Sequence, residues 1–145
     1  MRVNSMVNTN RNSVVYLPKV RNAKALHADH ELLLSWWRTR ARNDFSGSDI
    51  RRLRKALLAT TIPTEFDWYR AATGNAAAAI GIAIRQMKHN SILAEGVDQS
   101  VSAVLCCALD GNAAARVLIS CALRRRSKVD PECRDLIQGW LAVRF

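Results

Sequence analysis

The stretch that decides the fold is GNAAAAIGIAIRQMKH, residues 74–89. Glycine is favoured just past the end of a helix and asparagine at the N-cap of the next, and alanine is the strongest helix former. The stretch therefore predicts that one helix ends at Gly74 and that a second begins after Asn75 and continues to about His89. Basic side chains gather near the C-terminal end of this second helix, where the helix dipole favours positive charge.

The same five letters, GNAAA, return at residues 111–115, which is 37 residues further along the chain. The apolar positions that follow also match in kind, since Ile80 corresponds to Val117 and Ile82 to Ile119. A period of 37 lies in the range of helical-hairpin repeats, but a solenoid needs about three copies or more. Two explanations stay open. An alanine-rich chain could use the same tight helix–Gly–Asn–helix corner twice by coincidence, or the segment could be a true internal duplication.

Capping residues and apolar spacing predict further short helices along the chain. Their expected starts are Asn22 or Asp29 (running toward Arg42), Ser46-x-x-Asp49, Thr64-x-x-Asp67, Asp98 (after a loop over residues 90–97), Asn112 (running to about Arg126) and Pro131. Aromatic residues make up only 6% of the chain, which argues against a β-sandwich or barrel. We therefore expect an all-α fold, a compact bundle of six or seven short helices in antiparallel hairpins.

The first residues differ from the rest of the chain. Residues 1–22 are rich in asparagine and contain no acidic residue, so we expect a flexible basic N-terminal tail followed by a single helical domain over residues 23–145. Ordering of this tail by a partner, and an export or organelle address, are the alternatives.

The chain offers no segment typical of a membrane span. The longest nearly apolar runs, residues 76–84 and 101–109, are about half the length that a bilayer requires. The first residues also lack the apolar core of a secretory signal peptide. We expect a soluble, cytoplasmic protein, with export through a non-classical N-terminal signal as the alternative.

Positive charge is concentrated in the two flanks of the chain. The net charge is +10 and the pI about 10.3, and residues 1–60, 61–123 and 124–145 carry net charges of +8, −1 and +3. Arginine outnumbers lysine by 17 to 5, and its planar guanidinium suits phosphate and carboxylate. Two clusters are the candidate nucleic-acid or anion-binding site: Arg38, Arg40, Arg42, Arg51, Arg52, Arg54 and Lys55, and Arg124, Arg125, Arg126 and Lys128.

These clusters predict a small non-enzymatic binding or regulatory protein that docks on an anionic partner, with nucleic acid or a nucleoprotein complex as the leading partner. The helix after Asn75 opens with four alanines, which cannot pair with base edges, so we expect contact with the phosphate backbone. The alternative is a helical protein–protein interaction module that binds an acidic protein surface, such as a secreted effector, a mobile-element inhibitor of a host complex or an assembly subunit. Charge without a specific partner, and a homo-oligomer, also stay open.

Motifs for catalysis or cofactor binding are absent from the sequence. There is no P-loop, no G-x-S-x-G and no dinucleotide-binding glycine pattern, so we expect no enzyme activity and no cofactor. His27 and His30 lie one turn apart beside two acidic residues, which is at most half of a metal or acid–base site. The four cysteines form no C-x-x-C pair and are expected to be reduced and mostly buried.

Two aromatic groups have two possible roles. The pair Trp36-Trp37 and the group Phe66, Trp68 and Tyr69 could stack on nucleic-acid bases. Large aromatic side chains more often anchor a core, and we expect that role here.

Overall fold

The structure, a computed structural model, describes residues 23–142, so the predicted tail over residues 1–22 lies outside it. Within the described residues all regular structure is helical, which confirms the expected fold class, and no helix there is long and apolar enough to cross a membrane. The α-helices are α2 (Ala23–Leu34), α3 (Gly47–Leu58), α4 (Trp68–Ala72), α5 (Ala76–His89), α6 (Glu95–Leu109), α7 (Ala113–Arg126) and α8 (Arg134–Leu141). The short 3₁₀ helices are η1 (Trp36–Arg38), η2 (Arg42–Asp44) and η3 (Pro131–Cys133).

The chain divides into two compact units between Leu32 and Leu33. In the described part of the first unit, His27 Nε2 lies 3.1 Å from Glu31 Oε1, one turn further along α2. Both side chains are largely exposed, so this is an ordinary surface pair within one helix. All the other elements belong to the second unit.

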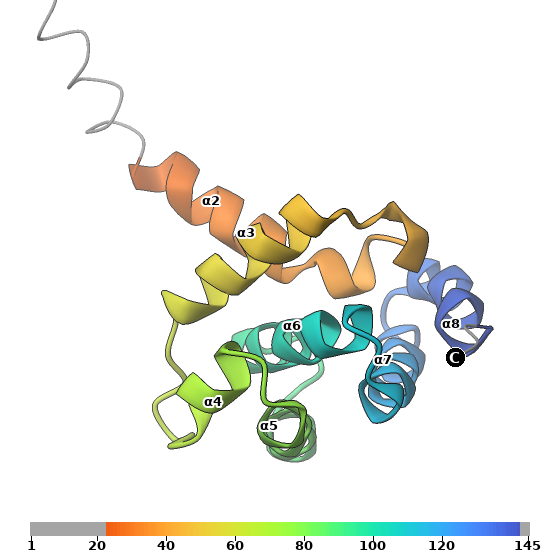
Figure 1. Cartoon of the computed structure of the whole chain (residues 1–145). Helices are drawn as coiled ribbons and strands as arrows, with labels where there is room; N and C mark the ends of the chain where they lie inside the picture. Colours follow the sequence, from red (N-terminus) through yellow and green to blue (C-terminus); the bar gives the residue numbers. More distant parts are fainter. Residues whose placement is uncertain (1–22, 143–145) are drawn as a thin grey trace, which may run out of the picture. The chain divides into compact units, whose positions relative to one another are not determined.

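The second unit is organised around α6. Helices α5 and α7 pack against it as its neighbours in the chain, and α3, α4 and η1 contact it as well (Figure 1). Residues 99–108 are all buried, and all of them except Gln99 are apolar or small, as a helix buried on every side requires. Its buried hydroxyls bond to backbone carbonyls, since Ser100 Oγ donates to the Gly96 carbonyl at 2.7 Å and Ser102 Oγ to that of Leu34 at 3.0 Å.

The two predicted Gly-Asn corners between helices, at residues 74–75 and 111–112, are confirmed. Gly74 and Gly111 adopt φ values of 114° and 101°, in the left-handed region where a side chain is strained. Asn75 Oδ1 accepts a bond from the backbone N–H of residue 78 at 2.8 Å, and Asn112 Oδ1 accepts the equivalent bond from residue 115 at 2.9 Å. Helices α5 and α7 therefore begin and end where the sequence predicts.

The prediction that Asp98 caps α6 is wrong. The helix begins at Glu95 after Ala94, whose side chain makes no cap bond. Asp98 lies in the first turn, and its carboxylate accepts hydrogen bonds from Trp37 and Arg38. The Asp98 side chain therefore bonds to residues far away in the sequence instead of capping its own helix.

The first predicted helix is also shorter than expected. It ends at Leu34 instead of running toward Arg42, and the chain continues through η1. Trp36 and Trp37 are the first two residues of η1, and both indole rings are buried in the core. The last predicted helix is likewise divided, into η3 and α8.

Replacing the capping asparagines tests how much the corners contribute to stability. Asn75→Ala and Asn112→Ala should each lower the free energy of unfolding by about 1 kcal/mol, because one backbone N–H in the first helical turn loses its acceptor. Urea denaturation followed by circular dichroism measures the change. The matched controls Asn75→Ser and Asn112→Ser keep an acceptor and should lose far less; equal losses for alanine and serine would contradict the capping role.

Candidate functional site

Arg38 is held inside the second unit by a carboxylate. Its Nε and Nη2 donate to Asp98 Oδ1 and Oδ2 at 3.0 and 2.9 Å, and Trp37 Nε1 donates to the same Oδ1 at 2.8 Å. The hydrogen bond with Asp98 raises the pKa of Arg38 above its ordinary value. The carbonyl of Arg38 accepts a bond from Cys133 Sγ at 3.5 Å. Arg38 therefore links η1 to both α6 and η3.

Arg40 is fixed by aromatic rings and by a second carboxylate. Its guanidinium carbon lies 4.5 Å from the ring centres of both Trp36 and Phe45, and its Nη2 donates to Asp49 Oδ2 at 3.1 Å. The backbone N–H of Ser46 and then the side chain of Arg40 lower the pKa of Asp49 through these hydrogen bonds. Arg40 therefore joins the turn after η1 to the capping box at the start of α3.

Arg54 joins the two repeated corners. Its Nη2 forms an ion pair with Asp110 Oδ2, and its guanidinium lies beside Gly74, where an added Cβ would be 3.2 Å from Nη1. Cys107 Sγ donates to the Gly74 carbonyl at 3.7 Å. The C-terminal ends of α4 and α6 thus meet at one cation, which the carbonyl ends of helices favour. Arg54 has a structural role that the basic pattern of the sequence did not reveal.

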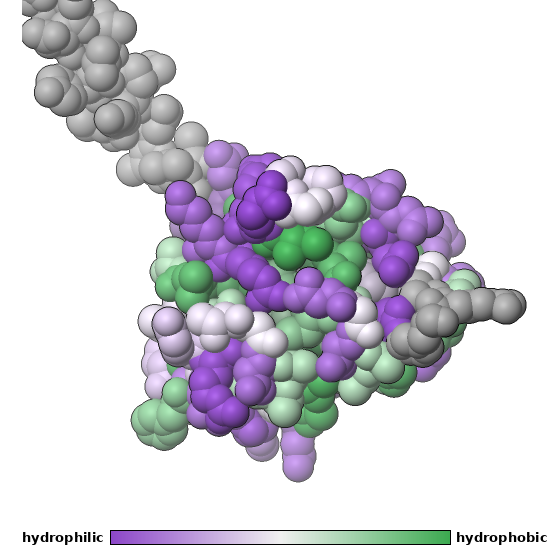
Figure 2. All heavy atoms as spheres, viewed as in Figure 1, coloured by the Kyte–Doolittle hydropathy of each residue, from purple (hydrophilic) through white to green (hydrophobic). Residues whose placement is uncertain are grey.

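The other three basic residues of α3 form an exposed row, which we call the α3 stripe: Arg51, Arg52 and Lys55. Within residues 23–142 no ion pair joins any of them to a carboxylate. The guanidinium carbon of Arg52 lies 5.5 Å from the Trp36 ring centre, so Arg52 and Arg40 share one indole ring. Figure 2 shows hydrophilic side chains over α3 and a hydrophobic group at its C-terminal end.

The remaining predicted residues belong to other elements than the α3 stripe, namely η2 and the C-terminal end of α7 with the turn that follows. Arg42 Nη1 donates to Asn43 Oδ1 at 3.2 Å. At the end of α7, Arg126 Nε lies 3.9 Å from Asp130 Oδ2. The residues of the second cluster that are exposed are Arg124, Arg125 and Lys128. In the part of the chain that the structure describes, no hydrogen bond or ion pair connects this cluster to the α3 stripe.

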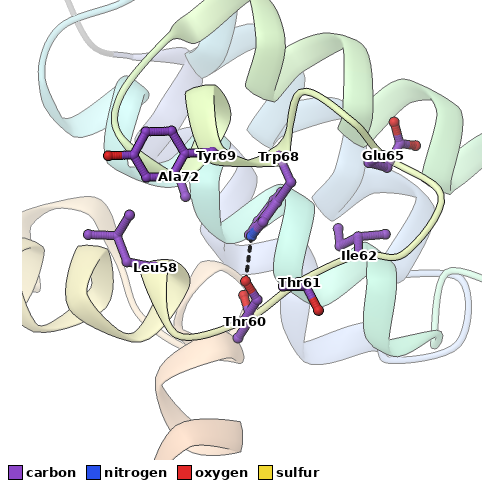
Figure 3. Close-up of a pocket in the computed structure, with 8 residues that line it drawn as sticks. All are labelled: Leu58, Thr60, Thr61, Ile62, Glu65, Trp68, Tyr69 and Ala72. Carbon is purple, nitrogen blue, oxygen red and sulfur yellow. Dashed lines mark hydrogen bonds between the residues drawn. The ribbon is translucent and has the colours of Figure 1, made fainter.

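Beside the C-terminal end of α3 the surface is hollowed into a pocket of about 220 Å³. Leu58, the last residue of α3, and Tyr69 of α4 lie across from each other at one end of it (Figure 3). Trp68 forms a wall between the two ends, and its Nε1 donates to the Thr60 carbonyl at 2.9 Å. The other described lining residues are Thr61, Ile62, Glu65 and Ala72.

The expectation that the whole aromatic group anchors the core is wrong for two of its three members. Trp68 is 6% exposed, but Tyr69 is 72% exposed and Phe66 is fully exposed. Helix α4 has only five residues, and its inward face is already filled by Trp68, Ala71 and Ala72. The start predicted at Thr64-x-x-Asp67 is also wrong, because α4 begins at Trp68 and Asp67 makes no side-chain cap bond.

Glu65 ties the loop before α4 to α5. Arg85 Nη2 and Nε donate to Glu65 Oε1 at 2.8 and 3.1 Å, and Gln86 Nε2 donates to Oε2 at 3.2 Å. The hydrogen bonds from Arg85, and to a smaller extent that from Gln86, hold the pKa of Glu65 below its ordinary value. The negative charge of Glu65 is therefore compensated from the side of α5. A second hollow, of about 400 Å³, is lined there by Thr64, Glu65, Arg85, Gln86, His89 and Asn90.

The thiols are unsuited to nucleophilic chemistry where they are buried. All four cysteines are free; Cys121 is exposed and the other three are buried, as expected. Burial raises the pKa of Cys106 to about 12 and that of Cys133 to about 11, so both are protonated near neutral pH. Among the described residues, no group of three His, Cys, Asp or Glu side chains lies close enough to hold a metal ion.

The two arginine–aspartate pairs should differ in their contribution to stability. The side chain of Asp98 is 17% exposed and serves both Trp37 and Arg38, whereas that of Asp110 is 56% exposed. We expect Asp98→Asn to cost about 2–3 kcal/mol, because it leaves a half-buried guanidinium without its counter-charge. Asp110→Asn should cost less than about 1 kcal/mol. Urea unfolding of both variants measures the difference. Equal losses of stability would contradict the larger structural role given to the Arg38–Asp98 pair.

Glu65 should make stability depend on pH in the acidic range. Its pKa is lower in the folded chain than the unfolded value of about 4.3, so its contribution is complete above that value and disappears as the pH falls through the folded pKa. Glu65→Gln should therefore be less stable than the wild type at neutral pH, and the gap should close in acid. Urea unfolding across a pH series measures it; a gap that stays constant with pH would show that the charge of Glu65 is not responsible.

The chain matches no family model, no curated protein and no solved structure.

Proposed function

We propose that this protein is a small non-enzymatic binding module that docks on nucleic acid through the α3 stripe. The observation that carries the proposal is a division among the arginines of the first cluster. Arg38, Arg40 and Arg54 are bonded to carboxylates of the same chain, whereas the residues of the α3 stripe are exposed and have no such partner in the described residues. Cations that are not already neutralised gain the most from phosphate, because they release the counterions condensed on it.

The layout of the α3 stripe suits phosphates more than bases. Arg51 and Lys55 occupy positions i and i+4 of one helix face, about 6 Å apart along the helix axis, and Arg52 lies about 100° around the helix from Arg51. Two of the three are arginines, which bind phosphate oxygens in a bidentate manner. The stripe contains no amide side chain that would read adenine, and its arginines suit the phosphate backbone, where most protein–DNA hydrogen bonds are made. The exposed cations at the end of α7 add to the field that attracts a polyanion.

A second candidate is docking on an acidic protein surface. The observation that favours it is the exposed apolar surface of Leu58, Phe66 and Tyr69, since such side chains commonly anchor protein interfaces. A stable complex with a protein partner that survives nuclease treatment would support this candidate over nucleic acid.

Removing charge from the α3 stripe tests the proposal. The variant Arg51→Ala/Lys55→Ala is compared with the control Lys88→Ala/Arg134→Ala, which removes the same charge from exposed positions on α5 and α8. Alanine is a strong helix former, so neither exposed pair should disturb the fold. Nuclease-treated protein is titrated with labelled duplex DNA, single-stranded DNA and RNA over a salt series.

The expected result is a weaker affinity for the stripe variant and a smaller salt dependence. The slope of log K against log salt should fall by about two, roughly one for each lost phosphate contact, while the control should keep a slope near that of the wild type. Equal effects of the two variants would reject the α3 stripe as the docking surface. Wild-type binding that vanishes well below physiological salt would reject nucleic acid as the partner.

A further inference from the structure

The row of cations on α3 leads directly into the pocket of about 220 Å³. Leu58 follows Lys55 by three residues, so the two lie on the same helix face about 4.5 Å apart along the axis. Leu58 is 51% exposed and forms one wall of the pocket, opposite Tyr69 (Figure 3). A strand that places its phosphates along the α3 stripe therefore has an apolar, aromatic-walled hollow within reach of the next nucleotide.

We propose that this pocket holds one unpaired nucleobase of a strand whose phosphates lie on the α3 stripe, so that the protein binds single-stranded nucleic acid in preference to duplex. This inference rests on the proposed function and adds to it a second contact and a strand preference.

The size and the walls of the pocket fit a single flat ring system. Its volume is below the range of about 300–1,000 Å³ in which drug-sized ligands are bound. Leu58 offers an aliphatic wall and Tyr69 an aromatic one, and Trp68 extends the apolar surface between the two ends (Figure 3). Proteins that bind single strands without sequence preference combine a basic track with aromatic side chains on which bases stack.

The polar groups of the pocket do not oppose a polyanion. Of the described lining residues only Glu65 carries a carboxylate, and Arg85 and Gln86 bind that carboxylate from the side of α5. The hydroxyl of Thr60 donates to the Leu57 carbonyl at 2.9 Å, and the carbonyl of Thr60 accepts from Trp68. Few polar groups are left to read a base edge, so the pocket should accept different bases.

Strand preference follows from the position of a base in a duplex. A paired base is stacked between its neighbours, and it can enter a pocket only after leaving the stack, which costs free energy. An unpaired base avoids most of this cost. The α3 stripe alone would contact the phosphates of either kind of strand, so a preference for single strands that depends on Tyr69 reports on the pocket.

Tyr69→Ala is the decisive variant, and Phe66→Ala is its matched control. Both side chains are largely exposed aromatics of the same segment, but only Tyr69 lines the pocket. The probes are a labelled single-stranded oligothymidylate and an adenine–thymine duplex of the same length, at one salt concentration. Tyr69→Phe retains the ring, and circular dichroism and urea unfolding verify that each variant is folded.

We expect Tyr69→Ala to weaken binding of oligothymidylate by about fivefold to about a hundredfold, which is the range for loss of one stacked base. Binding of the duplex should change little, and Phe66→Ala and Tyr69→Phe should resemble the wild type. If Tyr69→Ala binds oligothymidylate as the wild type does, while the stripe variant still lowers the salt slope, the base pocket is rejected and the docking function stands.

Two other outcomes would overturn the inference for different reasons. If the wild type binds neither probe at physiological salt, the proposed function fails and the base pocket fails with it. Suppose that Tyr69→Ala changes the binding of neither nucleic-acid probe but weakens the binding of an acidic peptide with apolar side chains. The pocket then serves a protein partner and the inference is wrong.

Discussion

The burial of residues 99–108 of α6 is the constraint on which the second unit depends. A stretch of helix without a solvated face needs apolar neighbours on every side, and the alanine-rich starts of α5 and α7 allow those helices to approach it closely. Asp98 precedes this stretch and its side chain is only 17% exposed, so its carboxylate is costly unless it is bonded, because a charge cannot leave water without compensation. Trp37 and Arg38 supply that compensation. The conformation of η1 is thus a consequence of packing around the central helix.

Local chemistry explains why some elements were predictable from the sequence alone. Gly74 and Asn75, like their counterparts at 111 and 112, act within a few residues of themselves, through a positive φ and through a bond to the third residue of the following helix. The capping box of α3 is local in the same way. Asp98 resembles such a cap in sequence, but its partners are about sixty residues away, at Trp37 and Arg38. Nothing in the sequence around it reveals that competition.

The candidate site was predictable only as a region. Arg51, Arg52, Arg54 and Lys55 look alike in the sequence, but the 3.6-residue period turns Arg54 toward the two glycine corners and leaves the other three exposed. Whether an arginine is paired depends on carboxylates supplied by other helices, as Asp110 is supplied for Arg54. The pocket was missed for a related reason, because its walls come from the end of one helix and the start of another across a break.

The burial of three thiols has a practical consequence for measuring how the core moves. A maleimide reagent can modify Cys121 in the folded chain, whereas it can reach Cys106 and Cys107 only when α6 is uncovered, and Cys133 only when η3 is uncovered. The modification rates of these native thiols therefore report the opening of two separate parts of the core. Local and global opening can be distinguished in this way without introducing a single substitution.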